Sequence, residues 1–228
     1  MEGRLGAWDD GSKLFEGESP GPVGRPDPAT ERRHRMSVRR PYGIVLGRFQ
    51  PVHLGHAEYL RAARRRCTRL VIGITNPDLA ALRATAEDPA RSMAWNNPFT
   101  YYQRTMMVEA ACADEGWTPG DYLVVPAPVN EPDRLGQYLP PPDEATVFVT
   151  IYDEWGETKK RRLEALGYSV ETLWRRTMAE RVTSGTEIRA ALRAGSARWR
   201  RHVSPRVVPL LEAYARDLTD RRHTGQNP

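Results

Sequence analysis

A short stretch that follows an apolar segment contains two histidines and other residues suited to binding phosphate. His53 and His56 lie in the stretch Gly47-Arg48-Phe49-Gln50-Pro51-Val52-His53-Leu54-Gly55-His56. Imidazole and guanidinium N–H groups donate hydrogen bonds to phosphate oxygens, and a glycine lets an anion approach the backbone closely. Either histidine alone could be an ordinary surface residue. Their combination with Arg48 and Gly55 predicts a site for a phosphorylated ligand.

The segments on either side of the histidines predict where they lie. Residues 44–46, Ile-Val-Leu, form an apolar run typical of a strand buried in a parallel sheet. From Gly55 onward, apolar residues recur at helical spacing, at Ala57, Leu60 and Ala63. The histidines therefore belong to the first turn of a helix, where backbone N–H groups lack intrahelical partners and attract anions.

A second turn with the same properties lies about 130 residues further along the chain. The sequence Ser184-Gly185-Thr186-Glu187-Ile188-Arg189 opens another expected helix, with hydroxyl groups at its start and a carboxylate in its first turn. Simple capping of the helix by Ser184 or Thr186 is the alternative interpretation. From the residues alone, both interpretations of this turn stay open.

The remaining segments predict how these turns are positioned. Further strands are expected at 69–74, 122–125, 146–151 and 168–173, separated by helices or loops. This order predicts an α/β fold with a central parallel five-stranded sheet and helices on both faces. Polar residues follow the second and fourth strands at one edge of the sheet, where ligands of open α/β sheets bind. These residues are Thr75, Asn76, Asp153 and Trp155.

A third helix is expected to open at residues 97–100, Asn-Pro-Phe-Thr. Pro98 suits the first turn of a helix, and Arg104 follows one turn inside. Asn97 has two interpretations, as a ligand of the substrate or as the residue that caps the helix.

Length and composition predict one domain. The chain has 228 residues, of which 39% are hydrophobic and 28% charged. We expect a disordered leader at 1–40, the domain at 41–218 and a flexible tail at 219–228, with translation starting at Met1 or Met36. The long polar loop at 79–97 is expected to be a lid or disordered. Because the chain has neither a membrane-spanning apolar run nor a signal peptide, we expect a cytoplasmic protein that does not bind membranes.

The formal charge of +5 and the pI near 9.4 favour anionic partners. Charge alone does not separate a nucleic acid from a small phosphorylated substrate, but arginine runs on helices are usually solvated faces, so nucleic acid is the less favoured partner. Cys67 and Cys112 lack the spacing of a zinc or redox motif, and we expect both to be core thiols. No protein metal site is predicted.

The pattern G-R-F-x-P-x-H-x-G-H, together with S-G-T-E-I-R, resembles the two phosphate motifs of the nucleotidylyltransferase superfamily. The longer first motif is similar to that of archaeal-type nicotinamide mononucleotide (NMN) adenylyltransferases. The resemblance implies a Rossmann-like fold and in-line attack of an anionic acceptor on the α-phosphorus of a nucleoside triphosphate, releasing pyrophosphate. Mg²⁺ is expected to arrive on the triphosphate.

The same resemblance assigns roles to individual residues. His53 and His56 would stabilise the α-phosphorus, and Arg48 would neutralise one of the anions. Binding of the nucleotide is assigned to Gly47, Phe49, Gly55, Ser184, Gly185, Thr186 and Arg189. Binding of the substrate is assigned to Thr75, Asn76, Asn97, Arg104, Asp153 and Trp155.

Three stretches depart from the adenylyltransferase pattern. Residues 75–78, Thr-Asn-Pro-Asp, replace a Gly-Ser pair, and the loop at 79–97 is long. Residues 152–156, Tyr-Asp-Glu-Trp-Gly, replace a Ser-Gly-Asn turn and look like the Asp-Asp-Trp-x-Gly-Lys segment of small cytidylyltransferases. The combination of Gly-Ile-Thr-Asn-Pro-Asp at 73–78 with Asn-Pro-Phe at 97–99 resembles the cytidylyltransferases of phosphonate antibiotic pathways. It implies CTP as donor and a small phosphonate as acceptor, with phosphonoformate favoured and 2-hydroxyethylphosphonate next.

Two alternatives stay open. An NMN adenylyltransferase would make NAD from ATP and NMN by the same mechanism. A protein that binds nucleic acid or senses nucleotides without turnover belongs to a different class, and the intact histidines weigh against it. A homo-oligomer is also open, because relatives of this group often assemble.

Overall fold

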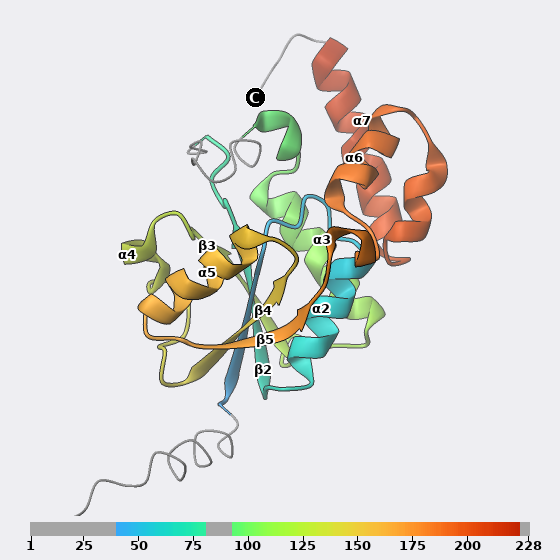
Figure 1. Ribbon diagram of the computed structural model, residues 1–228. Coiled ribbons are helices and arrows are strands. Elements are labelled where there is room, and N and C mark those ends of the chain that lie inside the picture. The colour runs from blue at the N-terminus through green and yellow to red at the C-terminus, as the bar shows by residue number, and fades with distance from the viewer. Residues whose placement is uncertain (1–39, 81–92, 224–228) are drawn as a thin grey trace, which may run out of the picture. The chain divides into compact units, whose positions relative to one another are not determined.

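The computed structural model describes residues 40–80 and 93–223 (Figure 1). Most of the predicted leader, including Met36, lies outside the described residues, as do the central part of the predicted loop and residues 224–228 of the predicted tail.

The centre of the domain is one sheet of five parallel strands in the order β3-β2-β1-β4-β5. The strands are β1 (Tyr42–Gly47), β2 (Arg69–Thr75), β3 (Tyr122–Ala127), β4 (Ala145–Ile151) and β5 (Ser169–Arg175). Every pairing is parallel, including that of β1 with both β2 and β4. The predicted fold class is therefore confirmed, and the chain reverses its direction of winding at β1, where a ligand crevice is expected.

The inner strands are buried on both faces, which explains their continuous apolar runs. Along β1, Val45 packs into one core, and Ile44 and Leu46 pack into the other. The same alternation places Phe148 of β4 in the first core and Val147 in the second. Successive residues of a strand point to opposite faces, so one short segment anchors both layers.

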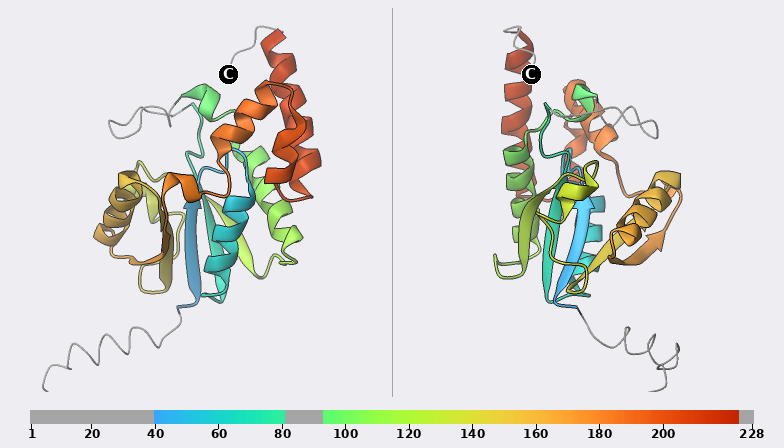
Figure 2. Two further views of the ribbon diagram at one scale, coloured as in Figure 1. Left: turned by 45° about the vertical axis from the view of Figure 1, so that its right-hand side comes forward. Right: turned by 90° about the vertical axis from the view of Figure 1, so that its left-hand side faces the viewer.

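Helices cover both faces of the sheet. They are α2 (Leu54–Arg64), α3 (Tyr101–Asp114), α4 (Pro132–Leu135), α5 (Glu154–Ala165), α6 (Gly185–Arg193) and α7 (Val207–His223), with short 3₁₀ turns η2 (Ala94–Asn96), η3 (Met178–Glu180) and η4 (Ala197–His202). Helices α2, α3 and α7 contribute to one core, and α4 and α5 contribute to the other. Figure 2 shows α4 and α5 on the side of the sheet away from α2 and α3.

The structure differs from the sequence prediction at two helix ends. Helix α3 begins after Thr100, whose hydroxyl accepts the N–H of Gln103 while the Gln103 side chain accepts the N–H of Thr100. This reciprocal capping box makes Thr100 the cap in place of Asn97. Helix α7 continues to His223, beyond residue 218, where the domain was expected to end. Cys67 and Cys112 are buried free thiols, as predicted.

None of the helices in the described ranges combines the length and the apolar character that crossing a membrane requires.

Candidate functional site

A cleft of about 900 Å³ opens at the carboxyl ends of the strands. It brings together nearly all the predicted site residues, although they come from four separate parts of the chain. Those that line it are Gly47, Arg48, Phe49, His53, Gly55, His56, Thr75, Asn76, Asp153, Trp155, Ser184, Gly185, Thr186 and Arg189. Asn97 and Arg104 are the two that do not.

The two predicted phosphate turns meet at the backbone carbonyl of Gln50. Arg189 of α6 donates a hydrogen bond of 2.5 Å to this oxygen across 139 residues of sequence. Gly185 lies against the same oxygen, so closely that a Cβ atom there would be 2.7 Å from it. Only glycine allows this approach. The start of α6 is therefore fixed directly against the loop between β1 and α2.

The loop between β1 and α2 is supported from below by the segment that precedes α3. Phe49 is fully buried and has a φ of 52°, an unusual value for a bulky residue that needs support from the surrounding structure. The Gln50 side chain provides that support, because it donates to the Phe99 carbonyl at 2.8 Å and accepts the Phe99 N–H at 3.0 Å. The backbone that carries the histidines is thus held by fixed contacts.

His53 and His56 form a stacked pair at the start of α2, with ring centroids 3.7 Å apart. His53 is the N-cap residue, and its Nδ1 accepts the backbone N–H of His56 at 3.3 Å. Because Nδ1 accepts, the hydrogen of a neutral His53 ring is on Nε2. The Nδ1 atom of His56 is buried and has no hydrogen-bond partner among the described residues. A buried polar atom without a partner at a cleft suggests that a ligand supplies one.

Both imidazoles are uncharged at neutral pH in the free protein. Burial, together with the positive charges of Arg181 and Arg189, lowers the pKa of His53 to about 3. Burial also holds the pKa of His56 well below its usual range, with contributions from His53 and Arg48. The same positive surroundings favour an anion in the cleft, and a bound phosphate would raise both values.

The first turn of α6 satisfies its own polar groups. The Ser184 hydroxyl accepts the N–H of Glu187, and the Glu187 carboxylate accepts the N–H of Ser184. Ser184 therefore caps the helix, as the simpler interpretation held. The N–H groups of Gly185 and Thr186 remain in the first turn, where a helix has no internal partner for them. This turn offers phosphate its backbone donors and the positive end of the helix dipole.

Arg189 and Arg104 are both buried, but they have different surroundings. Arg189 faces the cleft and also donates to Asn96 Oδ1 at 2.9 Å and to Thr186 Oγ1 at 3.1 Å. Burial lowers its pKa to about 10, so it stays charged at neutral pH. Arg104 has no exposed surface and lies beneath the cleft.

Arg104 serves the backbone, which corrects its predicted place among the substrate ligands. Its guanidinium donates to the carbonyls of Arg48, Thr75 and Asn76 at 2.7–3.1 Å. These carbonyls follow the ends of β1 and β2, so Arg104 ties the two strand ends together. Asn97 is also buried and donates to the Met93 carbonyl at 3.0 Å.

Several cleft residues escaped the sequence prediction. Arg181 precedes the second motif by three residues, and its guanidinium lies 4.4 Å from the centre of the Tyr152 ring and 3.9 Å from Asp153. The Tyr152 hydroxyl in turn accepts the indole N–H of Trp174 at 3.0 Å. The signal for Arg181 was its position just before S-G-T-E-I-R. Lys159 and Arg162 of α5 also line the cleft, and they lie only a few residues beyond the stretch singled out in the sequence.

Comparisons with known proteins agree with this geometry. Residues 44–191 match the family described as cytidylyltransferase-like. The chain is 42% identical over 170 residues to the phosphonoformate cytidylyltransferase of Streptomyces viridochromogenes, an alignment that covers 75% of this chain and 90% of that protein. It is 29% identical over 173 residues to the nicotinamide-nucleotide adenylyltransferase of Methanosphaerula palustris, covering 74% of this chain and 88% of that protein.

A solved structure shares the fold. The bifunctional NMN adenylyltransferase/ADP ribose pyrophosphatase of Francisella tularensis superposes with a TM-score of 0.52 at 14% identity. The match covers 81% of this chain and 54% of that one, so the chain spans about half the length of that protein. At this identity the likeness concerns the fold alone.

Proposed function

The chain belongs to the cytidylyltransferase-like family and is a nucleotidyltransferase, and from this premise we propose that it transfers CMP from CTP to a small phosphonate. Phosphonoformate is the acceptor that we propose, because a relative with 42% identity over most of both chains carries that name. We place the reaction in the cytoplasm and in phosphonate antibiotic biosynthesis.

The observation that carries the proposal is the contact between the two phosphate turns. The Gln50 carbonyl receives Arg189 and lies against Gly185, so the first turn of α6 faces the same cleft as His53 and His56. Two helix N-termini and four arginines that line one cleft suit a chain of phosphates rather than a single anion.

The reaction needs positioning and charge more than a protein nucleophile. An oxygen of the phosphonate forms a bond to the α-phosphorus of CTP, the bond from that phosphorus to the bridging oxygen breaks, and pyrophosphate leaves with the electron pair. The attacking oxygen is already anionic, so no general base is required. Neutral imidazole N–H donors, together with Arg48, would stabilise the charge on the α-phosphoryl oxygens, and the start of α6 would hold the departing pyrophosphate.

We also propose that Mg²⁺ enters with the triphosphate. Within the described residues, no group of three or more His, Cys, Asp or Glu side chains could hold a metal ion. The cleft is instead rich in arginine and N–H donors, a set that fits the phosphate oxygens of a nucleotide that brings its own ion. When bound, the ion would neutralise charge on the phosphates.

Two other functions make different demands. NMN adenylyltransferase activity has support from relatives with that name, but their identity is lower, at 29% for the one from Methanosphaerula palustris.

Nucleic-acid binding would need available basic side chains. Arg64, Arg66 and Arg200, from the basic runs, form ion pairs with Asp121, Glu171 and Glu212 respectively.

A pyrophosphate-release screen tests the proposal. Purified full-length protein with Mg²⁺ is given CTP or ATP in combination with phosphonoformate, 2-hydroxyethylphosphonate or NMN. We expect release with CTP and phosphonoformate at a kcat/KM at least tenfold above any other pair. Release with ATP and NMN alone would establish the adenylyltransferase instead, and salt-sensitive binding to duplex DNA without release would favour the third class.

A further inference from the structure

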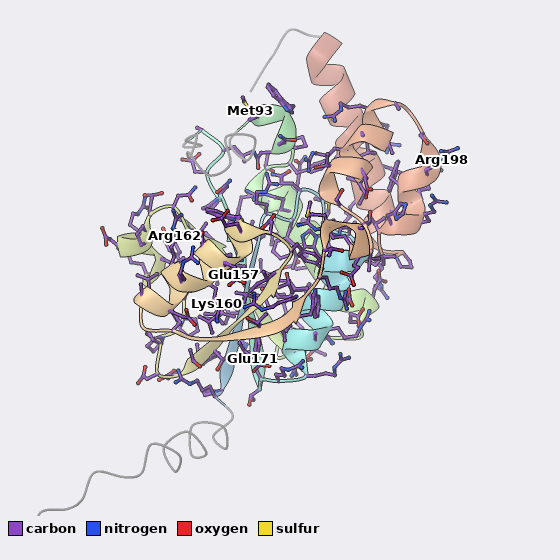
Figure 3. The ribbon with its side chains drawn as sticks, in the orientation of Figure 1. Met93, Glu157, Lys160, Arg162, Glu171 and Arg198 are labelled. Atoms are coloured by element: carbon purple, nitrogen blue, oxygen red, sulfur yellow. The ribbon has the colours of Figure 1, made fainter. Side chains whose placement is uncertain are left out.

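The cleft extends beyond the phosphate turns into an arm between α4 and α5, on the opposite face of the sheet from α2. The arm is lined by Asn130 and Asp133 from the segment after β3 and by one face of α5. This face carries Trp155, Lys159 and Arg162, which are spaced four and three residues apart and so lie along one side of the helix. Figure 3 shows Arg162 on the side of α5 that faces α4.

Lys159 brings a positive charge to the inner end of this arm. Its ammonium donates a hydrogen bond of 2.8 Å to the carbonyl of Leu46, at the end of β1. The next residues along the chain are Gly47 and Arg48, the start of the first phosphate motif. The bond fixes the ammonium beside the place where the α-phosphorus is expected. A cation there is positioned to bind the anion that attacks.

Arg162 adds a second positive charge, one helical turn further from the strand. Its guanidinium lies 5.2 Å from the centre of the Trp155 ring, and the contact orients the otherwise exposed side chain toward the arm. One face of the Trp155 ring is thereby occupied by a cation and is not available to a nicotinamide ring. Among the described residues that line the whole cleft, two carboxylates stand against five cationic side chains, so its balance of charge is positive. The carboxylates are Asp133 and Asp153, and the cations are Arg48, Lys159, Arg162, Arg181 and Arg189.

We propose that the α5 face of Lys159 and Arg162 is the acceptor subsite, in which Lys159 binds the attacking phosphonate group and Arg162 binds a second acidic group on the same small molecule. The assignment rests on the proposed function. It identifies the acceptor class as a compact phosphonate that carries a carboxylate. A compact acceptor with two acidic groups can contact both cations at once, whereas a monoanionic acceptor can contact only one of them.

The test compares Lys159→Met with Lys160→Met, a matched control on the same helix. Lys160 pairs with Glu164 at 3.5 Å and lies on the side of α5 away from α4 in Figure 3. We expect Lys159→Met to raise the KM for phosphonoformate at least 30-fold and to leave the Kd for CTP, measured by calorimetry, within threefold. Lys160→Met should change neither. Lys159→Gln, which can keep the bond to Leu46, replaces the methionine variant if that protein fails to fold.

Arg162→Met separates the two acidic groups. We expect the KM for phosphonoformate to rise at least tenfold, while the inhibition constant of methylphosphonate, which has no carboxylate, stays within twofold. An equal loss for both ligands would show that Arg162 contacts the phosphonate, and unchanged KM values in both the Lys159 and Arg162 variants would overturn the subsite. If the wild-type protein releases no pyrophosphate with CTP and any phosphonate, the proposed function itself fails.

Discussion

The turns that open α2 and α6 both present backbone N–H groups to the cleft, but their capping differs. Helix α6 has a complete capping box, in which Ser184 and Glu187 satisfy each other's backbone N–H groups. Helix α2 has no acidic residue in its first turn, and its cap is the imidazole of His53 at 3.3 Å, a long hydrogen bond. The cap of α6 stabilises the folded helix, whereas the cap of α2 is also a side chain that faces the expected ligand.

This difference separates the energetic roles of the two turns. A side chain lost from α6 removes hydrogen bonds that the folded protein makes for itself, so both stability and activity should fall. A side chain lost from α2 removes groups whose partner is expected to be the substrate, such as the Nδ1 atom of His56. Loss there should affect turnover more than folding.

The largest expected effect comes from His56→Ala. We expect kcat to fall about 10³-fold, because an N–H donor to the developing charge is lost, with the melting temperature within about 3 °C of the wild type. Pyrophosphate release and calorimetry measure the two quantities. Tyr102→Ala, at an exposed position of α3 outside the cleft, serves as the control. Turnover near the wild-type rate in the His56 variant would show that the α2 turn has no catalytic role.

Gly185→Ala should break the contact between the turns. The new Cβ would lie 2.7 Å from the Gln50 carbonyl oxygen, so α6 must move away from the α2 turn. A displacement of about 1 Å can cost about 10²-fold in rate, and we expect that loss together with about 2 kcal/mol of stability. Gly136→Ala is the control, since a Cβ there meets nothing within 4 Å. Wild-type activity in the Gly185→Ala protein would show that the two turns act independently.

His53 should make stability depend on pH. Its pKa is about 3 in the folded protein and near 6.5 when unfolded, so the unfolded state binds the extra proton at intermediate pH. Its contribution is therefore complete above pH 6.5 and is lost as the pH falls toward 3. We expect the free energy of unfolding to fall by about 1–2 kcal/mol between about pH 8 and pH 5. Water that enters the open cleft keeps this loss below the value that the full pKa shift implies.

Urea unfolding at several pH values, compared with His53→Gln, measures this contribution. Because the glutamine does not titrate, the variant should lose less stability than the wild type over the same pH range. Identical pH profiles for the two proteins would contradict the lowered pKa of His53.

The smallest effect is expected from Ser184→Ala. Loss of the hydroxyl that caps α6 should lower the free energy of unfolding by about 1 kcal/mol and the activity by less than tenfold. Chemical denaturation with Ser169→Ala, an exposed strand residue, as the control measures the difference. A loss of activity as large as that of His56→Ala, without a loss of stability, would show that Ser184 is a ligand rather than a cap.

Much of the fold followed from the sequence because its signals are local. Apolar runs such as residues 44–46 and 69–74 predicted the strands, and their alternation with helices predicted the parallel sheet. The turns at His53 and Ser184 were found because each pattern is short and continuous. The likeness to a solved structure and the family match agree with that prediction.

The rest of the site depended on contacts that local patterns do not contain. Arg104 has the residue type of a phosphate ligand, but three of its four carbonyl partners come from distant parts of the chain, which only the assembled sheet brings together. The same limit hid Lys159, whose importance comes from the Leu46 carbonyl 113 residues earlier. Capping of α3 was expected, if anywhere, at Asn97, but the helix is capped by Thr100 together with the side chain of Gln103.

The buried guanidinium of Arg104 has an evolutionary consequence. By tying together the ends of β1 and β2 from within, it holds the floor of the cleft through contacts that the side chains of α5 do not make. A lineage can therefore exchange residues on that helix and acquire a new acceptor while the triphosphate machinery keeps its shape. Among related proteins with different acceptors, the residues of α5 should accordingly differ more than those that hold the triphosphate.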